Sequence, residues 1–111
     1  MQEICLFAYN DEMNFKNIIP DDKGFYEIVG RTVTNALGHE EIVELERIYW
    51  DYLDFLRSEK LDIDGYIKRC DLHRGSTPFA AALAWWTYWE FEDREREGKP
   101  RPAWLQPFEP I

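Results

Sequence analysis

Cys70 and His73 stand one helical turn apart, so their side chains could face one metal ion or one substrate. A tetrahedral zinc site needs four ligands, and Cys5 and His39 are the only other cysteine and histidine. Catalysis by a cysteine nucleophile also needs an orienting group and an oxyanion site, which one helical turn does not supply. We therefore expect a buried thiol beside a surface histidine, with no metal, no cofactor and no catalytic residue.

Carboxylates are the second group that could do chemistry, and they cluster between residues 40 and 54. Two of them in different surroundings could act as acid and base, and several together could hold Mg²⁺ or Ca²⁺. The sequence around them has neither a glycine-bearing calcium loop nor a paired environment. Two interpretations stay open: a solvated charged face, or a surface that attracts a basic partner. The cluster consists of Glu40, Glu41, Glu44, Glu46, Asp51 and Asp54.

Composition limits the class of protein. A chain of 111 residues with 45% hydrophobic content predicts one folded domain. The net charge is −9, and residues 39–64 hold most of the excess, with nine acids against three bases. Such a negative field disfavours non-specific nucleic-acid binding. Neither a signal peptide nor a membrane span is recognisable, which predicts a cytoplasmic protein without membrane contact.

Three helices are expected to position these groups. Apolar residues at three- and four-residue spacing predict a helix from about 46 to 59. Asp62 is a candidate N-cap for a second helix over 63–70. Thr77 as N-cap and Pro78 at the first helical position open a third helix that runs to about 97. Residues 40–45 suit either a strand or the first turns of a helix, and 4–9 and 25–29 each suit a short strand.

The third helix is apolar around more than half of its circumference. A helix of this kind is normally buried on two sides. In so small a protein we expect the second side to belong to another subunit. The aromatic cluster fits a core and a dimer interface better than a platform for nucleic-acid bases, because such platforms lie in basic grooves. The apolar arc consists of Phe79, Ala82, Leu83, Trp85, Trp86, Tyr88 and Trp89.

Several runs between residues 31 and 91 together resemble the atypical ribbon-helix-helix (MetJ/Arc-like) domain family of alphaproteobacterial type. They are Arg31-Thr32-Val33-Thr34, Gly38-His39, Val43-Glu44-Leu45-Glu46, Tyr49-Trp50-Asp51, the second-helix entry Lys60 to Ile67, Arg74-Gly75 and Phe79 to Leu83. The resemblance implies an obligate homodimer in which one strand from each subunit pairs into a ribbon. In that family the ribbon enters the DNA major groove.

The resemblance also assigns residues to surfaces. Phosphate contacts, if DNA is bound, would come from Arg31, Lys68, Arg69 and Arg74. The dimer interface would consist of Val43, Leu45, Trp50, Leu83, Trp85, Trp86 and Trp89.

The chain departs from the family where the family reads DNA. If Val43 and Leu45 face the core, strand alternation turns Glu40, Ile42 and Glu44 to the reading face. Relatives carry Arg, Ser or Thr there. Carboxylates on this face would oppose phosphate, as would Asp62 and Asp64 at the phosphate-anchoring start of the second helix. These departures favour a protein partner over DNA.

We therefore predict a mostly α, ribbon-helix-helix-like intertwined dimer with a short β ribbon. Its parts are an N-terminal extension (1–30), the domain itself (31–97) and an irregular C-terminal tail (98–111). The predicted function is non-enzymatic regulation, with the acidic ribbon, Glu40, Ile42 and Glu44, binding the basic surface of a protein. The alternative is a DNA-binding transcriptional regulator of the ribbon-helix-helix type.

Overall fold

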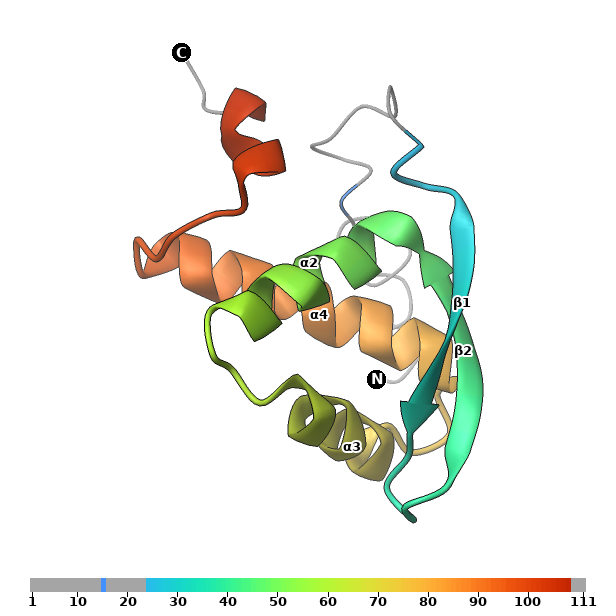
Figure 1. The fold of residues 1–111 in the computed structure, drawn as a ribbon. Coiled ribbons are helices and arrows are strands. Elements are labelled where there is room, and N and C mark those ends of the chain that lie inside the picture. The colour runs from blue at the N-terminus through green and yellow to red at the C-terminus, as the bar shows by residue number, and fades with distance from the viewer. Residues whose placement is uncertain (1–14, 16–23, 109–111) are drawn as a thin grey trace.

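A two-stranded antiparallel ribbon is followed by three helices and a short 3-10 helix (Figure 1). The computed structural model describes residue 15 and residues 24–108. The elements are β1 (Ile28–Thr34), β2 (Glu40–Glu46), α2 (Arg47–Ser58), α3 (Ile63–His73), α4 (Phe79–Arg96) and η2 (Ala103–Phe108). In Figure 1 the ribbon runs along one side of the helices, and its tip lies near α3. The small ribbon and the helices agree with the expected fold class.

Both strands of the ribbon come from one chain. β1 and β2 form a hairpin in which Arg31 pairs with Val43 and Thr34 pairs with Glu40. The Asn35 side chain closes the turn, because its Oδ1 accepts hydrogen bonds from the backbone N–H groups of Leu37 and His39, at 3.0 Å each. The resemblance implied pairing between strands of two subunits, whereas here β1 of the same chain is the partner of β2.

The open alternative for residues 40–45 is settled in favour of a strand. Val43 and Leu45 are buried, whereas Glu40, Ile42 and Glu44 are exposed. This period of two is the alternation that we expected for a strand with one face on the core. A one-residue slip in register would move the glutamates into the core, so burial of the two apolar residues fixes the pairing.

The first two predicted helices are confirmed. α2 covers Arg47–Ser58 and buries residues at three- and four-residue spacing, including Ile48, Tyr52 and Leu56. α3 begins after Asp62, whose Oδ1 accepts a hydrogen bond of 3.0 Å from the backbone N–H of Gly65. This bond satisfies one of the backbone donors that the first helical turn leaves without a partner inside the helix.

α4 differs from the prediction at its start and in its buried face. Its N-cap is Pro78, with ψ at 144°, rather than Thr77. The core side is lined by Phe79, Leu83, Thr87, Tyr88 and Phe91, while Trp89 is 46% exposed and Trp86 only partly buried. The apolar arc was too wide for the sequence alone to identify the face that packs on α2.

The expected division of the chain also needs correction. β1 begins at Ile28, so residues 28–30 belong to the ribbon and not to an extension. Phe15 is fully buried, with its ring 5.3 Å from that of Tyr49 and 5.0 Å from that of Tyr88. In the C-terminal part, Leu105 is buried within a 3-10 helix. The core therefore draws on segments at both ends, and the predicted strand over 4–9 lies outside the described residues.

No helix in the described part of the chain has both the length and the apolar character that crossing a membrane requires.

Truncation of the two faces of α4 should have different costs. Leu83→Ala should lower the free energy of unfolding by about 2–5 kcal/mol, because it leaves a cavity in the core. Measured on the monomer, Trp89→Ala should cost about 1 kcal/mol or less, because this side chain is half exposed in a single subunit. Urea denaturation of both variants measures the difference. Equal costs would mean that the Trp89 side chain is buried in the protein in solution.

Candidate binding face on the ribbon

The side of the ribbon that points away from the helices carries a mixed acidic and apolar surface, which we call the outer face. The strand register places on it Ile28, Gly30, Thr32 and Thr34 of β1 and Glu40, Ile42, Glu44 and Glu46 of β2. Ile42 is 69% exposed and Ile28 is 60% exposed. Glu40 and Glu44 have no ion-pair partner among the described residues. The three residues predicted to bind a partner therefore share one exposed face.

A glycine shapes this face. Gly30 lies opposite Glu44 in the register, and a Cβ atom at Gly30 would stand 3.2 Å from Ile42 Cγ2 and 3.5 Å from Glu44 Cγ. The first distance is shorter than an ordinary van der Waals contact. The Ile42 side chain therefore occupies space that a larger residue at position 30 would need. Gly30 thus lets the apolar and acidic side chains of β2 spread across both strands.

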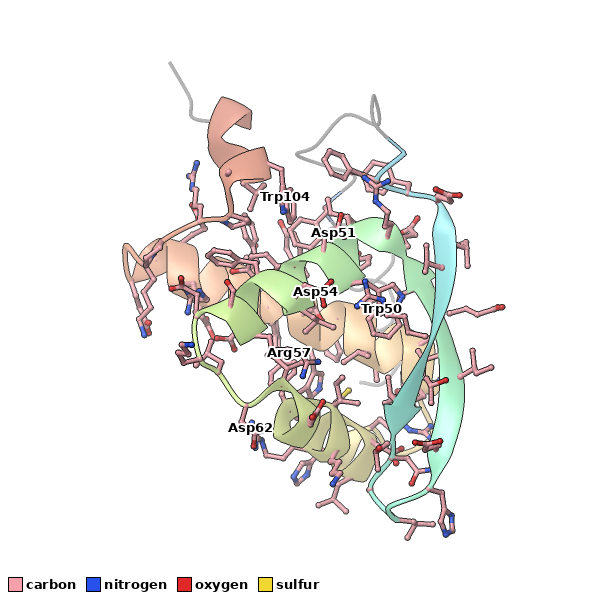
Figure 2. The ribbon with its side chains drawn as sticks, viewed as in Figure 1. Trp50, Asp51, Asp54, Arg57, Asp62 and Trp104 are labelled. Carbon is pink, nitrogen blue, oxygen red and sulfur yellow. The ribbon has the colours of Figure 1, made fainter. Side chains whose placement is uncertain are left out.

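The inner face is fixed to α2 by an arginine. The Arg31 guanidinium donates two hydrogen bonds to the carboxylate of Asp54, at 2.9 and 3.0 Å, and lies 5.3 Å from the ring centre of Trp50. The Trp50 Nε1–H donates to the carbonyl of Val29 at 2.8 Å. Figure 2 shows Trp50 and Asp54 along α2. The hydrogen bonds from Arg31 to Asp54 raise the pKa of Arg31, so this cation is engaged within the chain.

The tip of the ribbon is held by Asp71 of α3. Its carboxylate accepts a hydrogen bond of 2.8 Å from the backbone N–H of Ala36 and one of 2.6 Å from Nε of Arg74. The hydrogen bond from Ala36 lowers the pKa of Asp71. Burial acts in the opposite direction and raises this pKa, and the hydrogen bond and charge of Arg74 lower it further. Arg74 also donates to the carbonyl of Thr77 and lies over the ring of Phe79.

The four residues predicted to contact phosphate are therefore not equivalent. Arg31 and Arg74 are engaged in ion pairs within the chain, an exposed pair with Asp54 and a less exposed pair with Asp71. Only Lys68 and Arg69 are exposed cations on the surface of α3. The structure does not gather the four into one basic surface.

The residues predicted for a dimer interface also separate into two groups. Val43, Leu45, Trp50 and Leu83 are buried in the core of the single chain. The remaining three lie on α4: Trp86 packs against Tyr66 and His73 of α3, and the rings of Trp85 and Trp89 are 4.7 Å apart. Among them, Trp89 is the most exposed and the most accessible to a second subunit.

Cys70 is fully buried, as the sequence interpretation expected, and His73 is exposed. Burial raises the pKa of the Cys70 thiol to about 12, with a smaller contribution from Asp71. The thiol is therefore protonated at neutral pH and lacks the thiolate form that a nucleophile or metal ligand requires. In the part of the chain that the structure describes, no group of three or more His, Cys, Asp or Glu side chains is arranged to hold a metal ion.

A groove beside β2 was not predicted from the sequence. It has a volume of about 440 Å³ and lies between the strand and the first turn of α4. Its lining combines residues 41–44 with Phe79 and Ala80. These two parts are distant in the sequence, and only the packing of α4 against β2 brings them together. The prolyl start of α4 was the only local signal for where its first turn would lie.

No protein-family model, no curated protein and no solved structure matches this chain. The ribbon-helix-helix resemblance stays a prediction.

The clamp at the ribbon tip predicts a dependence of stability on pH. Because folding lowers the pKa of Asp71, its carboxylate stabilises the fold above the ordinary aspartate pKa of about 3.9. That contribution is lost as the pH falls through the lower value of the folded state. Asp71→Asn should reduce the free energy of unfolding by about 1–2 kcal/mol at pH 7, and the difference from the native protein should shrink below about pH 4.

Urea denaturation between pH 7 and pH 3 measures this difference. Asp93→Asn is the matched control, because Asp93 pairs with Arg96 on an exposed helix end and should cost little at any pH. A difference for Asp71→Asn that stays constant down to pH 3 would contradict the proposed role of the carboxylate.

Proposed function

We propose that this protein is a non-enzymatic regulatory module that binds another protein through the outer face of its ribbon. The observation that carries the proposal is the exposed set Glu40, Ile42 and Glu44 on a strand whose other face is buried. The expected partner has a surface that combines basic and apolar groups. No chemical step is required of the module, because its role is recognition.

The composition of the face suits this role. Exposed carboxylates attract a basic partner and raise the rate of productive encounter. Ile28 and Ile42 offer apolar area that loses water on contact, which supplies the affinity that exposed ion pairs alone seldom provide. The partner would meet a surface that is already in place, because Arg31 and Asp71 tie the ribbon to the helices and little conformational entropy is lost on binding.

DNA binding is the second candidate, and the exposed Lys68 and Arg69 are the observation in its favour. Two cations on one helix give a weak electrostatic footprint. The same helix begins beside Asp62 and Asp64, whose charges oppose a phosphate at its N-terminus. The carboxylates of the outer face add to that repulsion, so we place protein binding first.

Charge reversal on the outer face should abolish binding of a cationic probe. We expect the double variant Glu40→Lys/Glu44→Lys to weaken binding of a lysine-rich peptide by at least about tenfold at low salt. The variant Asp93→Lys/Glu97→Lys changes the net charge equally on the far end of α4 and should retain binding. Fluorescence anisotropy of a labelled peptide measures both.

Equal loss of peptide binding in the two variants would mean that only the net charge of the protein matters. This result would contradict the proposed face. A salt series with genomic DNA fragments tests the second candidate. Appreciable affinity for these fragments with a steep salt dependence would favour DNA as the partner.

We also propose that the protein is a homodimer through the side of α4 that carries the exposed Trp89, because Val43, Leu45, Trp50 and Leu83 are buried within one chain. Light scattering after gel filtration should give twice the mass of the 13.4 kDa chain at micromolar concentration. Trp89→Lys should shift the protein towards the monomer by placing a charge in the interface. A native protein that is monomeric under these conditions would contradict the dimer.

A further inference from the structure

We propose that the free edge of β2 takes an extended segment of the partner as a third strand, with basic side chains on the outer face and an apolar side chain in the groove beside α4. The inference rests on the proposed function and specifies how that face is used. In this mode, called β-augmentation, backbone hydrogen bonds supply affinity and alternate side chains supply specificity.

The backbone of β2 has one edge that pairs with β1 and one that pairs with no other described strand. The bond from the N–H of Asn35 to the carbonyl of His39, at 2.8 Å, sets the phase of the ladder. Because bonded and non-bonded pairs alternate in an antiparallel ribbon, residues 41, 43 and 45 face β1. The N–H and carbonyl groups of 40, 42 and 44 then point to the free edge.

The space beside this edge could take a side chain. The groove of about 440 Å³ lies along residues 41–44 and is closed on its far side by Phe79 and Ala80. Val43 and Phe79 give it an apolar floor. A strand added to β2 would turn every second side chain to the inner side, towards this floor. One β-branched or small apolar side chain opposite Val43 would find contact there.

The glutamates of β2 disfavour a second copy of the ribbon as the occupant. If two β2 strands paired antiparallel about Ile42, Glu40 would lie opposite Glu44 at both ends. Moving the two-fold axis by two residues, from Ile42 to Glu44, brings Glu44 opposite itself. Like charges directly opposite each other destabilise a sheet, and charged residues on an edge strand are a common defence against self-pairing. The same charges attract a strand that carries lysine or arginine.

These constraints define the recognised sequence. Basic residues are expected opposite Glu44 and Glu40, with a small or β-branched residue between them opposite Ile42. An apolar residue is expected opposite Val43, and a third basic residue opposite the exposed Glu41. The peptide Thr-Lys-Val-Thr-Arg-Lys-Thr satisfies this pattern in the antiparallel direction and serves as the probe.

Backbone methylation of the probe tests the mode of binding. Methyl groups on the backbone nitrogens of the two lysines remove hydrogen-bond donors that face β2. Methyl groups on the backbone nitrogens of the valine and the arginine point away from β2. We expect the first peptide to bind at least about tenfold more weakly than the unmodified probe and the second to bind within about threefold of it. Fluorescence anisotropy with the native full-length protein measures all three affinities.

A variant of the protein gives an independent readout. Ala80→Trp should fill the groove and weaken binding of the probe, while Ala81→Trp, on the neighbouring helix position outside the groove lining, should not. Circular dichroism establishes that both variants are folded, and the methylated peptides test the proposal on the native protein if they are not.

The outcomes separate the two proposals. If Glu40→Lys/Glu44→Lys abolishes binding but both methylated peptides bind alike, the edge pairing is wrong and the binding face stands. If the charge reversal has no more effect than Asp93→Lys/Glu97→Lys, the binding face itself is wrong. Absence of binding by the unmodified probe up to about 1 mM would overturn the edge pairing.

Discussion

The pleat of β2 is the constraint on which the rest of the structure depends. Val43 and Leu45 enter the core of the single chain, and Ile42 and Glu44 face away from it. Because the side-chain period of a strand is two, these two apolar contacts determine the position of every glutamate on the ribbon. Burial of carboxylates in the opposite register would cost several kcal/mol each. The acidic outer face is thus a direct consequence of how the inner face packs.

The charges of the molecule are divided by the same arrangement. The cations nearest the ribbon form ion pairs within the chain. Arg31 joins β1 to Asp54 of α2, and Arg74 supports Asp71 at the ribbon tip. Glu40 and Glu44 face outward from β2, are exposed and have no partner among the described ion pairs. Part of the acidic excess of residues 39–64 therefore lies on one local surface. The exposed ion pairs contribute little stability each, but they fix the orientation of the strand that carries this surface.

The parts of the fold that depend on local signals could be predicted. The apolar stripe of α2 and the Asp62 cap each follow from residues within a few positions of one another, whereas residues 40–45 suited a strand or a helix equally. What depends on distant contacts could not be predicted. The pairing of β2 with β1 of the same chain was missed because the resemblance pointed to another subunit. The buried face of α4 could not be identified because its apolar arc is broad, and neither the burial of Phe15 nor the groove at Phe79 leaves a local pattern.

The acidic edge of β2 also bears on assembly. In a ribbon-helix-helix dimer two strands meet across a two-fold axis, which requires edges that tolerate their own copy. This edge carries glutamates at alternate positions, so its own copy is the strand that it pairs with least favourably. Any dimer must then use another surface, such as the side of α4 that carries the exposed Trp89. The features that make self-pairing of the ribbon unfavourable are those that favour a basic strand. In this way specificity against one partner and attraction for another arise from the same side chains.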